Sequence, residues 1–284
     1  MAKRRIVDLH LHSSASDGTD SPKELVAVAE RAGVTTMALM DHDVLDGVED
    51  ARTAAIAAGI TLISGTELSV QHGDAKMHML VYFLEPTAGP LQDKLGWLRQ
   101  GRNERNLAII ENLNRAGYTI TIDDVRAKAA GRSIGRPHIA DALVERGYFD
   151  HRDAAFVDLL GDGGTVYVER ERFKAEEAIE LARTSGAVPV IAHPYTIRAG
   201  HQEYTRIFKD LTNAGLGGIE AHHSAHAPEL RIRLTEIAHA LGLAATGGSD
   251  YHGAGKRDYG VGVGKGDLRV PPSAVDELEA QRGQ

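Results

Sequence analysis

The sequence has no cysteine among its 284 residues. This absence excludes thiolate metal sites, thiol nucleophiles and structural disulfides, so histidine, aspartate and glutamate are the side chains left to hold a metal ion. Internal repeats and low-complexity tracts are absent too, which excludes repeat architectures. The chain is 42% hydrophobic and 25% charged, a composition typical of a soluble globular protein.

Long hydrophobic runs are also missing. No uncharged apolar stretch approaches the roughly 18 residues that a membrane-spanning helix needs. Residues 3–5 are basic, but only Ile6 and Val7 precede the charge of Asp8, and two apolar residues do not make the core of a signal sequence. We therefore expect a cytoplasmic protein that does not enter a membrane, and the lack of cysteine agrees with a reducing compartment.

The formal net charge is -8, which argues against a surface that coats nucleic acid broadly. A local basic channel remains compatible with this charge, especially where bound metal ions neutralise carboxylates. The sign of the net charge therefore does not decide the substrate.

Short apolar runs alternate with helical segments along most of the chain, a pattern that predicts a parallel α/β layer or barrel. One helix start is explicit, because Ser21, Pro22 and Glu24 form the pattern of an N-cap, a first-turn proline and a capping-box glutamate. The seven expected strands cover residues 5–10, 36–40, 60–64, 75–83, 187–192, 217–220 and 243–246.

The alternation fails between residues 83 and 165, where the sequence predicts helices at 92–115, 122–130, 137–146 and 151–160. A run of glycine and aspartate at 161–164 predicts a turn at the exit of this region. We therefore expect a helical cap domain at 91–165, inserted into a domain that consists of residues 1–90 and 166–284.

Ionisable side chains follow nearly every expected strand, at the end where α/β folds keep their sites. His10 and His12 share one face of the first strand, because side chains alternate along a strand. A single histidine at a strand end is more often a hydrogen-bonded loop residue than a ligand. Burying so many ionisable groups together is costly unless cations pair with them. The sequence therefore predicts a multinuclear metal centre built from His10, His12, Asp17, His42, Glu67, His78, His193, Asp250 and His252.

The motifs that carry these residues resemble those of the PHP (polymerase and histidinol phosphatase) family of metal-dependent phosphoesterases, which are related to the amidohydrolases. The first motif runs from Asp8 through His10 and His12 to Asp17, and the others are centred on His42, His193 and the pair Asp250 and His252. The resemblance spans residues 8–252 and implies a distorted (β/α)7 barrel of the α/β class, here with the inserted helical cap.

The family's ligand pattern implies two or three divalent metal ions. The first is held by His10, His12, Glu67 and Asp250, the second by Glu67, His78 and His193, and the third by Asp17, His42 and His252. Many relatives have histidine at the position of Asp17. The carboxylate oxygen of Asp17 is a harder ligand than an imidazole nitrogen and favours manganese or iron over zinc. Asp41 and Asp43, on either side of His42, are expected to orient ligands or move protons.

Within the family, the chain is most similar to the branch of 3′,5′-nucleoside bisphosphate phosphatases and 5′-to-3′ exoribonucleases. The helical insertion and the segment 135–140 carry this similarity. Arg136 and His138, at an expected helix start, are candidates for phosphate binding. Arg102 is a second candidate, although charged helix faces are often only solvated. His223 is a candidate for phosphate contact or general acid.

The resemblance implies hydrolysis of nucleotide phosphate esters, with Glu67, Asp250 and His193 as the catalytic residues and a metal-bridging hydroxide as nucleophile. The expected substrates are 3′,5′-bisphosphonucleotides, whose 3′-phosphate is released so that pAp becomes AMP and phosphate, and short 5′-phosphorylated RNA. Two alternatives stay open, a histidinol phosphate phosphatase and a metal-bound regulatory module without activity. We expect no stable protein partner.

Overall fold

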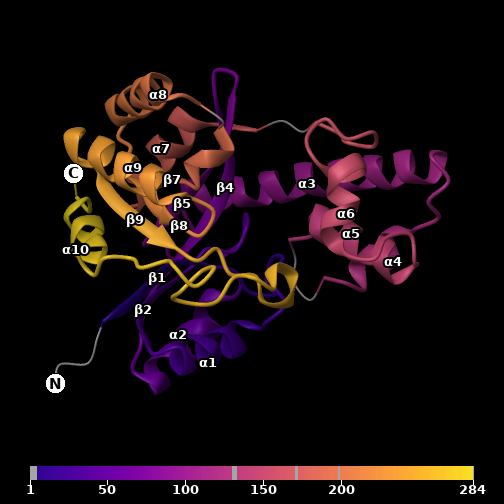
Figure 1. Cartoon of the computed structure of the whole chain (residues 1–284), viewed down its shortest axis with the longest axis horizontal. Coiled ribbons are helices and arrows are strands. Elements are labelled where there is room, and N and C mark those ends of the chain that lie inside the picture. The colour runs from indigo at the N-terminus through magenta and orange to yellow at the C-terminus, as the bar shows by residue number, and fades with distance from the viewer. Residues whose placement is uncertain (1–4, 130–132, 170–171, 198, 284) are drawn as a thin grey trace.

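The structure is a computed structural model and describes residues 5–129, 133–169, 172–197 and 199–283. In this part of the chain, strands and helices mix in an α/β fold (Figure 1). The strands are β1 (Ile6–Leu11), β2 (Val34–Leu39), β3 (Thr61–Ile63), β4 (Gly65–His72), β5 (Ala75–Tyr82), β6 (Phe173–Lys174), β7 (Val188–Ala192), β8 (Gly218–His223) and β9 (Ala244–Gly248).

Helices connect most of these strands. The α-helices are α1 (Pro22–Arg31), α2 (Val48–Ala58), α3 (Pro90–Arg115), α4 (Ile122–Arg126), α5 (Arg136–Glu145), α6 (Arg152–Ala155), α7 (Ala175–Thr184), α8 (His201–Asn213), α9 (Pro228–Ala240) and α10 (Ser273–Ala280). A π-helical turn η1 (Phe156–Leu160) follows α6, and two 3₁₀ turns, η2 (Pro194–Ile197) and η3 (Gly253–Lys256), follow β7 and β9. The expected helix 122–130 ends at Arg126, and residue 130 lies outside the described residues.

The strands form two sheets, in the orders β1-β2-β3 and β6-β4-β5-β7-β8-β9. The expectation of seven parallel strands was wrong, because β4 and β6 are additional and β5 runs antiparallel to β4 and β7. A tight turn at Gly73 and Asp74 joins β4 to β5, and such a short connection requires antiparallel neighbours. Polar residues such as Thr66 and Gln71 interrupt β4, so its sequence does not show an apolar run.

Backbone contacts join the two sheets. Isolated β-bridges link Leu11 to Tyr251 and His42 to Glu67, so strand ends of both sheets meet on two sides. One buried cluster also includes side chains of both sheets, among them Leu9 of β1, Met40 after β2 and Val190 of β7. The two sheets therefore share a hydrophobic core and direct their strand ends toward one region.

The segment between β5 and β6 is helical, as expected. Figure 1 shows α4, α5 and α6 at one end of the long axis of the molecule, with both chain termini at the other end, and α3 reaching from the sheets to this helical group. The group has a separate hydrophobic cluster that includes Leu113, Val125, Ile139 and Leu143. None of the helices in the described ranges combines the length and the apolar character that crossing a membrane requires.

The predicted start of α1 is confirmed. Ser21 is its N-cap, the Ser21 hydroxyl accepts a hydrogen bond from the backbone N–H of Glu24, and Pro22 is in the first turn. The Glu24 carboxylate accepts in return from the backbone N–H of Ser21 at 2.8 Å. This capping box ends the loop that carries Asp17, so it fixes where the loop returns to the body of the protein.

Candidate metal centre

Glu67 lies at the centre of the predicted ligands, and its two carboxylate oxygens face different sets of imidazoles. Oε1 is 2.8 Å from Nδ1 of His78 and 2.8 Å from Nε2 of His193. Oε2 is 3.2 Å from Nε2 of His10 and 3.1 Å from Nε2 of His12. One carboxylate thus joins two separate groups of potential ligand atoms. The sequence pattern had placed Glu67 after the end of an expected strand, but the residue lies within β4.

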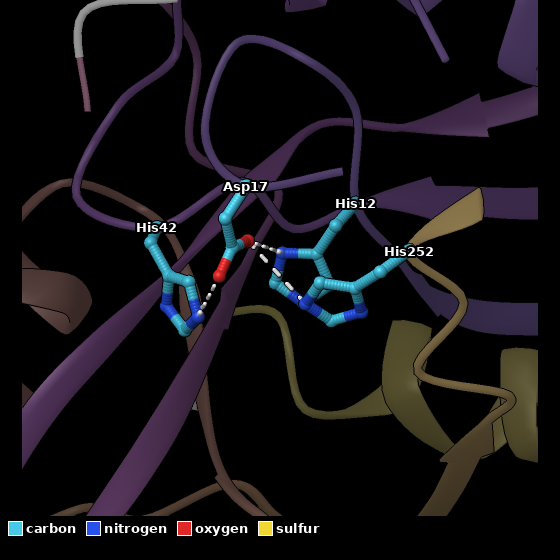
Figure 2. A group of neighbouring side chains, drawn as sticks. All are labelled: His12, Asp17, His42 and His252. Carbon is cyan, nitrogen blue, oxygen red and sulfur yellow. Dashed lines mark ion pairs between the residues drawn. The ribbon is translucent and has the colours of Figure 1, made fainter. Parts of the chain in front are cut away.

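A further group surrounds Asp17 (Figure 2). Its carboxylate is 3.3 Å from Nε2 of His252, 3.8 Å from Nε2 of His42 and 3.8 Å from Nδ1 of His12. His12 therefore has one ring nitrogen directed to the Glu67 group and the other to the Asp17 group. The resemblance had assigned His12 only to the first ion, whereas the structure places its ring between the Glu67 group and the Asp17 group.

Asp250 has two different environments for its two oxygens. Oδ1 lies 3.8 Å from Nε2 of His10 and 3.6 Å from Nε2 of His12. Oδ2 is 2.6 Å from Nζ of Lys256 and 3.3 Å from Nε2 of His223. Lys256 is a site residue that the sequence reasoning missed, because an isolated lysine in a glycine-containing loop has no pattern that marks it.

The backbone at these positions is unusual. Among the described residues, four that are not glycine have positive φ, and three of them belong to this site: Asp43 (57°), His193 (27°) and Asp250 (57°). Such conformations cost free energy and concentrate where the surrounding structure imposes a particular direction on a side chain. Gly248 permits another close approach, since a Cβ there would lie 2.4 Å from the backbone N of His10.

Buried carboxylates orient the ligands. Asp41 accepts hydrogen bonds from the backbone N–H of Ser13 at 2.8 Å and from the hydroxyls of Ser13 and Ser16, both at 2.6 Å. These bonds hold the loop that presents Asp17. The expectation that Asp41 orients ligands thus agrees with its contacts, whereas Asp43 contacts the guanidinium of Arg102.

Glu220, within β8, is a second residue to which the sequence analysis gave no role. Its Oε1 is 2.8 Å from Nδ1 of His10, and its Oε2 accepts from the backbone N–H of His193 at 2.7 Å. A carboxylate on Nδ1 keeps the proton there and leaves the lone pair of Nε2 free. The sequence showed only that a glutamate ends the expected strand 217–220. It did not show which imidazole this glutamate contacts.

The protonation states suit metal ligation. Burial and the neighbouring His252 imidazole lower the pKa of His12 to about 3. Burial likewise lowers the pKa of His78, to about 4. Burial alone raises the pKa of Glu67, but His42, His78 and His10 outweigh it and hold this pKa well below its usual range. His12 and His78 are therefore neutral imidazoles and Glu67 is an ionised carboxylate, the forms that bind cations, whereas Glu220 and Glu67 outweigh burial and raise the pKa of His10.

The donor set fits divalent metal ions. Three groups have ligand atoms that all lie within 4.8 Å of one another, and two ligands of one tetrahedral ion are about 3.4 Å apart. Within the described part of the chain, Nδ1 of His12 is buried without a hydrogen-bond partner, which suits a nitrogen directed at a cation. The groups are His10, His12 and Glu67; Glu67, His78 and His193; and His12, Asp17, His42 and His252.

The four candidate substrate residues lie in different places. Arg102 of α3 donates from Nε and Nη2 to Oδ2 of Asp43 at 3.0 and 2.5 Å, and its pKa is raised, since Asp43, Asp17 and Glu67 outweigh burial. His138 is buried, and its Nδ1 accepts from the backbone N–H of Gly135 at 3.0 Å. Arg102 therefore lies beside the ligand groups, and His138 is close enough to Asp17 for that carboxylate to oppose the burial that lowers the pKa of His138.

Arg136 instead contacts the helical segment. Its Nη1 donates to the carbonyl of Leu160 and to Asp162, both at 2.9 Å, and its guanidinium lies 5.3 Å from the ring centroid of Tyr167. His223 lies at the site, since it contacts Asp250. The structure thus brings Arg102, His138 and His223 near the candidate ligands, whereas Arg136 contacts Leu160, Asp162 and Tyr167.

A mixed α/β fold whose strand ends gather histidine and carboxylate ligands around a bridging glutamate defines the class of metal-dependent hydrolases. The sequence model of the PHP domain matches residues 8–187. The chain belongs to the PHP family.

Three relatives illustrate the match. A 3′,5′-nucleoside bisphosphate phosphatase of Chromobacterium violaceum is 32% identical over 257 residues, covering 89% of this chain and 90% of that protein. A 5′-3′ exoribonuclease of Haemophilus influenzae is 32% identical over 86% of this chain and 89% of its own length. A solved structure from Bifidobacterium adolescentis, assigned as a metal-dependent phosphoesterase, is 33% identical, with a TM-score of 0.88 and coverage of 99% and 97%. The chain is accordingly a metal-dependent phosphoester hydrolase.

Proposed function

We propose that this protein hydrolyses phosphate esters of nucleotides, releasing the 3′-phosphate of 3′,5′-bisphosphonucleotides and acting also on short 5′-phosphorylated RNA. The observation that carries the proposal is the position of Glu67, whose two oxygens face two imidazole groups at 2.8 to 3.2 Å. Cationic side chains, Arg102 and Lys256, lie beside the same groups. The relatives named a bisphosphate phosphatase and an exoribonuclease support the substrate class.

The residues assigned to the metal ions are those of the family pattern, with manganese as the preferred ion because Asp17 supplies a hard oxygen to the third position. The nitrogens of His12 face both neighbouring groups, which supports at least two ions. Bound divalent ions supply Lewis acidity toward phosphoryl oxygens and lower the pKa of water.

The protein's own groups have separable tasks in this proposal. Glu67 holds the two imidazole groups in register, and His193 and Asp250 complete them from β7 and β9. Nδ1 of His223 accepts from the backbone N–H of Ala225 at 3.0 Å, so the proton of a neutral His223 is on Nε2, toward Asp250. We assign this N–H to a hydrogen bond with a phosphoryl oxygen of the substrate, in which the neutral ring keeps its proton.

The negative charge of the phosphoryl group requires hydrogen-bond donors in addition to the metal ligands. Arg102 is held by Asp43 through two of its five N–H groups, and the others remain to bind phosphoryl oxygens. We assign His138 a contact with the same phosphoryl group. Arg136 is assigned an indirect task, since its contacts with Leu160 and Asp162 order the helical segment that presents His138.

We also propose that the two sheets close into one barrel and that the helical segment forms a cap domain on it. The β-bridges between the sheets support closure into a distorted (β/α)7 barrel. The separate hydrophobic cluster of the helical segment supports a cap domain at 91–165 within a barrel domain of residues 1–90 and 166–284. A cap that supplies Arg102 and His138 to the mouth of such a barrel completes its anion site.

The direct test is hydrolysis by manganese-loaded protein, with pAp and 5′-phosphorylated oligoribonucleotides as substrates. We expect phosphate from pAp and mononucleotides from the oligonucleotides, with Glu67→Gln reducing both rates by at least about a hundredfold. Preference for histidinol phosphate over pAp would favour the small-molecule phosphatase instead. No turnover in a broad phosphoester panel, with metal bound, would favour a regulatory module.

A further inference from the structure

A cavity of about 820 Å³ lies between the helical segment and the loop that follows β9. Asp141 of α5 and Arg152 of α6 line one wall, and Lys256, Tyr259 and Lys265 line the other. We call this space the junction cavity. Its volume is in the range of sites that enclose ligands of nucleotide size, about 300 to 1,000 Å³.

The junction cavity adjoins the metal centre. Lys256, which lines it, places Nζ 2.6 Å from Oδ2 of Asp250. Thr19 also lines it, and its backbone N–H donates to the carbonyl of the predicted ligand His252 at 3.2 Å. A phosphate ester held at the ligand groups therefore has the cavity beside it, with room for the rest of the molecule.

The walls combine an aromatic ring with cations. Nζ of Lys256 is 5.6 Å and Nζ of Lys265 is 5.2 Å from the ring centroid of Tyr259. Over the ranges that the structure describes, no carboxylate lies within ion-pair distance of Lys265. An aromatic face accepts a base or a ribose, and an ammonium group accepts a phosphate.

Carboxylates in the wall of the junction cavity argue against a ligand with many negative charges. Exposed carboxylates of Asp150, Asp153 and Asp258 line the same cavity, and the Asp141 carboxylate is paired with Arg152 at 2.5 and 2.8 Å. A polyanion along the whole wall would meet these like charges. A molecule with one compact anionic group beside the lysines fits the charge pattern better.

We propose that the junction cavity binds the leaving nucleoside half of the substrate, with its remaining phosphate at Lys265 and its ring system against Tyr259. This inference rests on the proposed function and specifies it, since it makes a mononucleotide the preferred leaving group. It also gives the helical segment a second task, because α5 and α6 supply one wall of the cavity.

The test compares a nucleotide with a small ester on the full-length, metal-loaded protein. The substrates are pAp and 4-nitrophenyl phosphate, which lacks a nucleoside. Lys265→Met removes the outer ammonium, and Val144→Trp fills the cavity from α5. We expect each variant to lower the ratio of kcat/KM for pAp to that for 4-nitrophenyl phosphate about tenfold. Lys209→Met, at an exposed position of α8, is the matched control and should leave the ratio unchanged.

Binding of 5′-AMP, measured by titration calorimetry, provides a readout that does not depend on turnover. We expect its Kd to rise about tenfold in Lys265→Met and to stay at the wild-type value in Lys209→Met. Because Lys265 is exposed, this variant should fold even if Val144→Trp does not.

The outcomes separate this inference from the proposed function. An equal effect of Lys265→Met on both substrates, together with unaltered AMP binding, would overturn the junction cavity as the nucleoside site. Hydrolysis of 4-nitrophenyl phosphate without hydrolysis of any nucleotide would do the same and leave the phosphoesterase intact. AMP binding that depends on Lys265 in a protein that hydrolyses nothing would support the cavity and refute the proposed function.

Discussion

Replacing Glu220 by glutamine tests how the protein orients its metal ligands. The Glu220 side chain is fully buried and accepts two hydrogen bonds, from Nδ1 of His10 at 2.8 Å and from the backbone N–H of His193 at 2.7 Å. Glutamine has nearly the same shape but only one accepting atom. Its amide NH2 must therefore face one of the two donors.

Each orientation has a different cost. If the NH2 faces the backbone N–H of His193, two donors oppose each other in a buried site, which costs about 1 to 3 kcal/mol. If it faces His10, the imidazole relieves the conflict by moving its proton from Nδ1 to Nε2. Nε2 then carries a proton where it faces Glu67 and His12, and its lone pair is no longer available to a metal ion.

The expected result of Glu220→Gln is a loss of metal affinity of about 10- to 100-fold, or of about 1 to 3 kcal/mol of stability, with kcat reduced accordingly. Metal content after dialysis, Mn²⁺ titration calorimetry and urea unfolding of the chelated protein measure these quantities. Glu180→Gln, at an exposed position of α7, is the control. Metal affinity within twofold of wild type, with unfolding free energy unchanged, would refute this account of Glu220.

Four further predictions concern other parts of the site. Arg102→Met should destabilise the protein by about 3 kcal/mol in urea unfolding, because it removes the guanidinium from the buried carboxylate of Asp43, and an effect below 1 kcal/mol would contradict this. Gly248→Ala should lower metal content, since the new Cβ would lie 2.4 Å from the backbone N of His10; full occupancy at the wild-type Kd would show that the backbone adapts. Mn²⁺ at a hundredfold its Kd should stabilise the protein by about 2.7 kcal/mol in thermal unfolding. The affinity for Mn²⁺ should also rise with pH. Burial lowers the pKa of His10, but the Glu220 and Glu67 carboxylates outweigh burial and raise this pKa well above normal, so a bound metal ion must displace a proton from His10. Binding of Mn²⁺ that does not depend on pH would refute this assignment.

The sequence by itself selected candidate ligands that the structure brings together, and it placed most of the helices and strands. His10 and His12 point together because side chains alternate along a strand, and this follows from local geometry alone. The start of α1 at Ser21 and the helical character of the segment after β5 are also local properties, set by capping chemistry and by the loss of the strand pattern. The family resemblance on these motifs was confirmed.

The tertiary structure alone decided which partners these side chains meet. The pattern did not reveal β4, because a strand paired in a hairpin does not need a continuous apolar run, and Glu67 was therefore placed after a strand. Arg102 acquires its position from Asp43, 59 residues away, and Glu220 meets His10 across 210 residues. Local sequence specifies which residue occupies a position and which face of its strand or helix it is on. Residues so far apart in the chain come into contact only through the packing of strands and helices. For that reason the candidate ligands could be predicted from the sequence, whereas the contacts of Glu220 and Lys256 and the presence of the junction cavity could not.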